Sequence, residues 1–143
     1  MGLRRDGREA AIQFLYQVDS YKPAQLEEAL AAFWKQNEIK PNVRDFANDL
    51  LKGVLPKLPE VDAKIRTLAD NWDFERLAMV DRNILRLAVY EMLFRPEIPP
   101  VVSINEAIEI AKKFSSAESG AFVNGLLDRV KKELLRPARQ AAG

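Results

Sequence analysis

The stretch that most decides the fold is residues 77–94, which read LAMVDRNILRLAVYEMLF. Its apolar positions are Val80, Ile84, Leu85, Leu87, Ala88, Val89, Met92 and Leu93. These positions cover most faces of a helix with 3.6 residues per turn and do not alternate with period two. A helix that is apolar on most of its faces is buried among other helices. The stretch therefore predicts an all-α fold with this helix at its centre.

The same spacing of apolar residues extends outward from this helix in both directions. It predicts helices at about residues 3–20, 24–36, 43–54 and 60–72 before it, and at about 103–114 and 119–135 after it. About seven helices and a length of 143 residues favour one domain over residues 1–135. Residues 136–143 carry no such pattern and are expected to form a flexible tail.

Prolines mark most of the predicted helix ends, because the residue before a proline avoids the helical conformation. The expected breaks are Lys22-Pro23, Lys40-Pro41, and the pair Pro56 and Pro59. Pro96, Pro99 and Pro100 are expected to form a stiff linker after the central helix. These prolines join the helices within one unit and do not separate domains.

Four further local features carry predictions about single positions. Ser103 and Glu106 have the spacing of a capping box at the start of the sixth helix. Asp73 is expected to cap a short turn, and Trp72 is expected to face inward from the fourth helix. Gly125 lies inside the last helix, where glycine costs about 1 kcal/mol relative to alanine. A close helix–helix contact at Gly125 is the expected compensation.

Composition excludes several classes of chemistry. The chain has 22 basic and 21 acidic residues, and it contains neither cysteine nor histidine. Disulfides, thiolate metal sites and cysteine nucleophiles are therefore excluded. The commonest general base at neutral pH is also missing. No glycine-rich nucleotide-binding motif is present. The sequence favours a binding protein without a cofactor over an enzyme.

The hydropathy pattern gives no sign of a membrane protein. No apolar run approaches the roughly 20 residues that a membrane-spanning helix needs. The N-terminus also lacks the apolar core of a signal peptide. The cytoplasm is therefore the expected compartment, and no membrane partner is expected.

Acidic residues gather near one predicted helix junction, at Asp70, Asp73, Glu75 and Asp81. Two acids that converge in a cleft with shifted pKa values can form a hydrolase site. Helix capping and a solvated surface explain the same residues, and this is the interpretation that we prefer.

The first helix begins with a group of arginines. Arg4, Arg5 and Arg8 share one edge of the helix, because residues three and four apart are neighbours. Positive charge in a first turn is unfavourable against the helix dipole, so an external anion explains these arginines better than helix stability does. Their guanidinium groups are expected to be free for phosphate. Tyr16 follows on roughly the same side and could stack on an unpaired base, although a half-buried core position is equally compatible.

A second basic region lies on the last two predicted helices. It contains Lys112, Lys113, Arg129, Lys131 and Lys132. Most of these side chains are expected to be solvated or to pair with Glu109 and Glu133.

Three ordered motifs in the second half of the chain carry a family resemblance. They are residues 81–91 leading to Ile98-Pro99, then residues 102–112, and finally residues 122–128. Together with the first helix, this series resembles the NusB family of bacterial transcription antitermination factors. The resemblance covers nearly the whole chain.

The resemblance implies a fold of two antiparallel helical bundles packed together. It also implies binding to the single-stranded boxA element of nascent ribosomal RNA, together with the small-subunit ribosomal protein NusE. The complex acts with other Nus factors to help RNA polymerase read through terminators. Some members are homodimers and others are monomers, and the sequence does not distinguish these states.

Single positions can be compared with the family's motifs. Arg4, Arg5 and Arg8 match its arginine-rich segment, and Asp6 departs from it, which implies weaker RNA binding by this chain alone. Tyr16 and Lys112 match positions near the RNA. Acidic residues that match positions near NusE or the RNA are Glu75, Asp81 and Glu118. Phe114 and Phe122 are expected to be mostly core residues, an interpretation that allows partial exposure.

Two alternatives remain open at this point. One is the NusB-like helical domain of ribosomal RNA cytosine methyltransferases, which continues into a catalytic domain with a cysteine. The other is a protein-interaction scaffold without RNA binding. Which bases are read, and whether RNA binding needs NusE, are also open.

Overall fold

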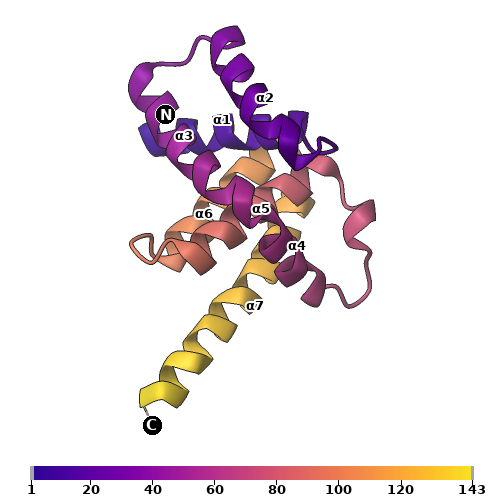
Figure 1. Ribbon diagram of the computed structural model, residues 1–143. Helices are drawn as coiled ribbons and strands as arrows, with labels where there is room; N and C mark the ends of the chain where they lie inside the picture. The colour runs from indigo at the N-terminus through magenta and orange to yellow at the C-terminus, as the bar shows by residue number, and fades with distance from the viewer. Residues whose placement is uncertain (1, 143) are drawn as a thin grey trace. The chain divides into compact units, whose positions relative to one another are not determined.

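The computed structural model describes residues 2–142, with side chains for residues 2–134 (Figure 1). Within this range the ordered elements are α-helices and two short 3-10 helices, with no strand. The all-α prediction is therefore confirmed. The chain folds as two compact units, Met1–Pro59 and Glu60–Gly143. In the described part of the chain, no helix is long and apolar enough to span a membrane.

The first unit contains α1 (Leu3–Gln17), α2 (Pro23–Gln36), α3 (Pro41–Val54) and the short helix η1 (Leu55–Lys57). Proline stands in the first turn of both α2 and α3. Proline suits this place because its missing N–H would have had no helical partner. The expected breaks at Pro23 and Pro41 are thus confirmed as helix starts.

Aromatic residues fill the core of the first unit. The rings of Phe14 and Phe33 meet edge to face with centroids 5.4 Å apart, and both residues are buried. The Trp34 indole N–H donates to Asn48 Oδ1 at 3.0 Å, which ties α2 to α3. Ala11 and Leu15 of α1 are also buried in this core.

The second unit contains most of α4 (Leu58–Thr67), then η2 (Phe74–Arg76), α5 (Met79–Phe94), α6 (Pro100–Phe114) and α7 (Ala117–Ala142). Every residue of α5 from Asn83 to Met92 is buried. Both α6 and α7 pack against α5. The prediction of a central apolar helix is therefore confirmed within this unit.

The predicted capping box at Ser103 is wrong. The helix α6 begins one turn earlier, at Pro100, so Ser103 lies inside it. Its hydroxyl donates to Glu91 Oε1 on α5 at 2.8 Å, and both side chains are buried. A buried carboxylate needs a hydrogen-bond donor, and Ser103 supplies one. This residue therefore links two helices and does not cap one.

The chain between α3 and α5 also differs from the prediction. The predicted end of the third helix at Val54 is confirmed, and Pro56 lies in η1 and Pro59 in the first turn of α4, so a short 3-10 helix connects α3 to α4. Because α4 ends at Thr67, Trp72 lies in the connection to α5 and not on a helix. The predicted cap at Asp73 is confirmed, since its Oδ1 accepts from the Glu75 N–H at 3.2 Å at the start of η2.

The close helix–helix contact expected at Gly125 is found at two other glycines. A Cβ at Gly125 would have no neighbour within 4 Å, so the predicted close contact there is wrong. A Cβ at Gly7 would lie 2.5 Å from the Phe46 ring, where α1 meets α3. At Gly120 a Cβ would lie 2.8 Å from Lys112 Cγ, where α7 meets α6. The close approaches are thus at Gly7 and Gly120.

Three expectations about domain organisation stay predictions. They are the packing of two bundles against each other, the single domain over residues 1–135 and the flexible tail at residues 136–143. The helix α7 runs to Ala142, and the side chains of that tail lie outside the described residues.

Candidate functional site

The first group of candidate residues lies on α1. Arg4 is exposed, and among the described residues no hydrogen bond or ion pair involves it. Arg5 is half-buried and has an interaction partner. Asp6 is the acidic residue of the first turn, and Gly2, the N-cap residue of α1, offers no side-chain cap. The free N–H groups of this turn and the Arg4 side chain together favour an external anion.

Arg8 differs from the expectation of a free guanidinium group. Its side chain is buried, with only 3% of its surface exposed. Its guanidinium carbon lies 5.5 Å from the centroid of the Phe46 ring on α3. The adjacent Gly7 lets Phe46 approach α1 closely, and the approach of α3 covers Arg8. Of the three arginines, Arg4 therefore has the most accessible charge.

Tyr16 lies near the end of α1, and 44% of its surface is exposed. This exposure leaves the ring accessible, which is compatible with stacking on an unpaired base and also with a half-buried position. Tyr21 follows in the turn after α1 and is exposed to 48%. Exposed phenol rings of this kind can stack on unpaired bases.

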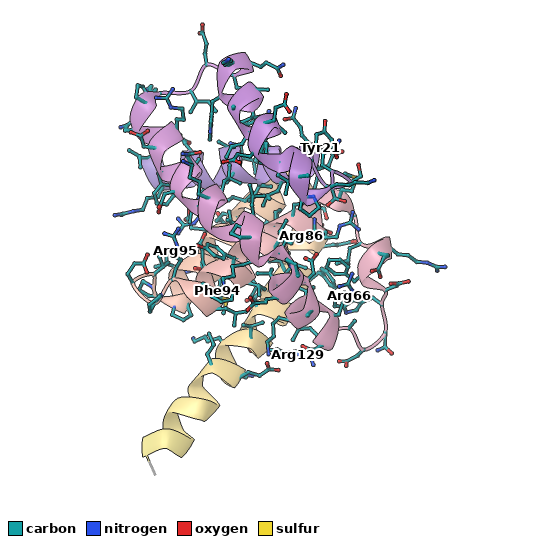
Figure 2. The ribbon with its side chains drawn as sticks, in the orientation of Figure 1. Tyr21, Arg66, Arg86, Phe94, Arg95 and Arg129 are labelled. Atoms are coloured by element: carbon teal, nitrogen blue, oxygen red, sulfur yellow. The ribbon has the colours of Figure 1, made fainter. Side chains whose placement is uncertain are left out.

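A second group of candidates lies in the second unit, around Glu75. The Glu75 carboxylate accepts from Arg66 Nη2 at 2.8 Å, and both side chains are at least half exposed. Figure 2 shows Arg66 between α4 and the connection that follows it. The hydrogen bond from Arg66 is the main cause that lowers the pKa of Glu75 below its ordinary value. The pair leaves Glu75 charged at neutral pH.

A titration of Glu75 tests this pair. Carbon-detected NMR is expected to give a pKa for Glu75 below its ordinary value, because the carboxylate form accepts from Arg66. The Arg66–Glu75 ion pair is fully formed above the ordinary pKa of a glutamate. It breaks as the pH falls through the lowered pKa of Glu75. In the variant Arg66→Gln, the pKa of Glu75 is expected to rise toward its ordinary value. An unchanged titration in that variant would contradict this assignment.

The residues around Glu75 are fixed by several contacts. Phe74 is buried, and the guanidinium carbon of Arg66 lies 4.4 Å from its ring centroid. Arg129 of α7 donates to the Leu68 carbonyl at 2.9 Å and to Asp70 Oδ2 at 3.0 Å. Figure 2 shows Arg129 on the α7 ribbon. The connection between α4 and α5 is therefore attached to both α4 and α7.

Asp81 joins the start of α5 to the start of α7. Its Oδ2 accepts from the Ser119 hydroxyl at 3.2 Å. Its Oδ1 is buried and has no hydrogen-bond partner among the described residues. Ser119 also exchanges a hydrogen bond with Ser115 at 2.7 Å. The expected acidic position is thus tied into a hydroxyl cluster that the sequence pattern did not indicate.

The remaining candidates lie at the corner between α6 and α7. Lys112 is exposed and pairs with Glu109 Oε2 at 3.1 Å. Glu118 is exposed in the first turn of α7, next to Ser119. Phe114 is 51% exposed, so its expected core position is wrong, because α6 ends there. Phe122 is half-buried and meets the Trp72 ring edge to face with centroids 5.7 Å apart.

The structure brings Asp81, Lys112 and Glu118 together in the second unit, whereas Arg4, Arg5 and Tyr16 belong to the first. Sequence patterns missed Gly7, Arg66 and Ser119, whose roles depend on partners from other helices. Gly7 also lies inside a predicted helix, so the signal that pointed to Gly125 could have identified it as well. Among the described residues, no group of His, Cys, Asp and Glu side chains could hold a metal ion.

Comparisons with known proteins place this geometry in context. A family model described as the NusB family matches residues 5–132. The transcription antitermination protein NusB of Sorangium cellulosum (strain So ce56) is 45% identical over 139 residues, covering 97% of this chain and 99% of that protein. The protein of the same name from Myxococcus xanthus (strain DK1622) is 45% identical over 141 residues, covering 96% of this chain and 100% of that protein.

Two solved structures are similar across almost the whole chain. T. maritima NusB has a TM-score of 0.77 and 40% identity, covering 91% of each chain. A chain in the crystal structure of antitermination factors NusB and NusE with double-stranded RNA has a TM-score of 0.74 and 28% identity. That match covers 93% of this chain and 98% of the other.

Proposed function

Because this chain belongs to the NusB family of transcription antitermination proteins, we propose that it binds boxA RNA of nascent ribosomal transcripts together with NusE. In this role it helps RNA polymerase, with the other Nus factors, to read through terminators. The observation that carries the proposal is the similarity to a protein solved in complex with NusE and RNA, over 93% of this chain. The cytoplasm, where such a factor meets RNA polymerase, is its proposed compartment.

The proposed RNA surface of the first unit is the exposed edge of α1. Arg4 and Arg5 contact phosphates there, and Tyr16 stacks on an unpaired base. Arg8 is not assigned to the RNA, because its buried guanidinium group packs against Phe46 and so stabilises the contact of α1 with α3. Two neutralised phosphates on a single strand give a salt slope of about −1.4, compared with about −2 for three. The burial of Arg8 therefore lowers the expected salt dependence.

The proposed NusE surface lies in the second unit. Glu75, Asp81 and Glu118 carry negative charge that repels RNA and attracts a basic partner. A basic ribosomal protein beside them removes this repulsion, so we expect the two proteins to bind RNA more tightly together than this chain does alone. Lys112 contributes the positive charge of this corner and is assigned to the RNA. The relatives are named as antitermination proteins, which fits a factor that is not an enzyme.

A charge-matched pair of double variants tests the RNA surface. In Arg4→Ala/Arg5→Ala, the affinity for boxA RNA is expected to fall, and the salt slope is expected to shrink in magnitude by about 1.4. The control is Lys35→Ala/Arg44→Ala, which removes two exposed positive charges from α2 and α3 of the same unit. Its affinity and slope are expected to stay close to those of the unchanged protein.

The measurement is fluorescence anisotropy with labelled boxA RNA at several salt concentrations, with and without NusE. An unrelated single strand of equal length distinguishes phosphate contact from sequence recognition. Equal affinities for both double variants would contradict the assignment of the RNA surface to α1. Wild-type binding to neither RNA, even with NusE present, would contradict the proposed function itself.

A further inference from the structure

A pocket of about 490 Å³ lies in the connection between α4 and α5. It is lined by Asn71, Trp72, Asp73, Arg76 and Leu77. This volume falls in the range of about 300–1,000 Å³ that is typical of small-molecule sites. Glu75 of the proposed NusE surface lies in the same connection, but it is not among the residues that line the pocket.

The lining combines an aromatic ring with hydrogen-bonding groups of both kinds. The Trp72 indole is half-buried, and Phe122 supports it edge to face at an interplanar angle of 77°. Arg76 and Asn71 are exposed hydrogen-bond donors at the same pocket. The Asp73 carboxylate is an acceptor beside them. A ring with donors and acceptors around it is the combination that binds a nucleobase by stacking and edge contacts.

Arg76 is the least engaged of the arginines around this connection. Arg66 is paired with Glu75 at 2.8 Å, and Arg129 with Asp70 at 3.0 Å. The Arg76 Nε lies 4.0 Å from Asp73 Oδ2, and 87% of the Arg76 side chain is exposed. Arg76 is therefore available for a phosphate or for the edge of a base.

The pocket is held in shape before any ligand arrives. Arg129 fixes the start of the connection through Leu68 and Asp70. Buried Phe74, with the Arg66 guanidinium group over its ring, fixes the end of the connection. A preformed site costs little ordering entropy on binding. The backbone around the pocket therefore needs little ordering on binding, whereas the exposed Arg76 side chain is ordered only by the ligand.

We propose that this pocket takes one unpaired nucleotide of the bound RNA strand, with the base against Trp72 and Arg76 at its phosphate or edge. The inference rests on the proposed RNA-binding function and adds a second contact point, in the other unit, to that on α1. A peptide segment is the competing occupant. The exposed guanidinium group beside an indole ring favours a nucleotide, because it complements both the charge and the flat face of that ligand.

Tryptophan fluorescence tests the stacking directly. The chain has two tryptophans, so Trp34→Phe leaves Trp72 as the only indole. Adding boxA RNA to this variant is expected to quench the Trp72 emission, with a midpoint that matches the anisotropy Kd. An RNA of the same length that lacks its bases but keeps its phosphates is expected to cause little quenching.

Variants of the pocket test its contribution to affinity. Arg76→Ala and Trp72→Leu are each expected to weaken RNA binding by roughly 5- to 100-fold, the loss that one base contact supplies. Trp72→Phe keeps an aromatic face and is expected to retain most of the affinity. The control Arg44→Ala removes an exposed arginine from α3 and is expected to change little. Circular dichroism confirms that each variant is folded, and exposed Arg76 provides a test even where Trp72→Leu does not fold.

The outcomes separate the pocket from the proposed function. Binding that depends on Arg4 and Arg5, with no Trp72 quenching and no effect of Arg76→Ala, overturns the pocket and leaves the function standing. A loss of NusE affinity in Arg76→Ala without RNA, at unchanged RNA affinity, assigns the pocket to a protein partner and also overturns the inference. Absence of RNA binding by the unchanged protein overturns both.

Discussion

The variant Arg86→Met is expected to lower the free energy of unfolding by about 3–5 kcal/mol, the usual cost of removing one partner of a buried ion pair. Arg86 donates from Nε to Asp62 Oδ1 at 2.8 Å and from Nη2 to Asp62 Oδ2 at 2.9 Å. Its Nη1 also donates to Asn83 Oδ1 at 3.0 Å. The Arg86 and Asp62 side chains are only 11% and 14% exposed. The substitution therefore leaves a nearly buried carboxylate without its partner.

Chemical denaturation measures this loss, and a surface pair provides the control. Lys132 and Asp128 form an ion pair at 3.1 Å, with side chains 72% and 49% exposed. Lys132→Met is expected to cost no more than about 0.5 kcal/mol, because solvent screens such pairs. The double variant Asp62→Leu/Arg86→Met removes both buried charges and is expected to be more stable than Arg86→Met alone. Equal losses for Arg86→Met and Lys132→Met would contradict this account.

Alanine at Gly7 is expected to destabilise the protein by about 1–3 kcal/mol, the usual cost of overpacking a well-packed contact. The added Cβ would lie 2.5 Å from Cδ2 of Phe46 and 3.3 Å from its Cε2. The Phe46 ring would have to move, and the Arg8 guanidinium group that lies against it would move as well. Gly7→Ala is therefore expected to reduce RNA affinity in addition to stability, since both depend on the shape of this edge.

The matched control is Gly125→Ala on α7, where the same Cβ meets nothing within 4 Å. In a helix interior with free space, alanine is expected to raise stability by about 0.5–1 kcal/mol. Thermal and chemical denaturation of the two variants should thus give shifts of opposite sign. Shifts of the same sign would show that local helix propensity, and not the approach of α3, governs Gly7.

Much of the candidate site could be predicted from the sequence because its residues lie at recognisable places on helices. Arg4 was expected to be exposed from its position in the first turn of a helix, and it is. Tyr16 had two compatible interpretations, and the structure adds that its ring is 44% exposed. Arg8 has the same residue type as Arg4 and lies on the same edge, yet it is buried. Its environment is set by Phe46, which is distant in the sequence.

For the acidic residues of the second unit, the sequence predicted the charged positions but not their partners, which are distant in the sequence. Their types and positions predicted a charged surface, and Glu75 and Glu118 are exposed. The partners of Glu75 and Asp81 are Arg66 and Ser119, and neither pairing follows from a helical repeat. The cap at Asp73 was predictable because it is local, joining residues two positions apart.

The sequence by itself determined which segments are helical, which faces are apolar and which family the chain resembles. Helical periodicity, proline breaks and short motifs depend only on residues that are close in the sequence, so they can be recognised without a structure. The tertiary structure alone decided that Arg8 is covered, that Ser103 binds Glu91, and that Gly7 and not Gly125 is a close contact. It also decided that Asn71, Trp72, Asp73, Arg76 and Leu77 line an open pocket. These features depend on contacts between side chains that are distant in the sequence, and no local sequence pattern specifies such contacts.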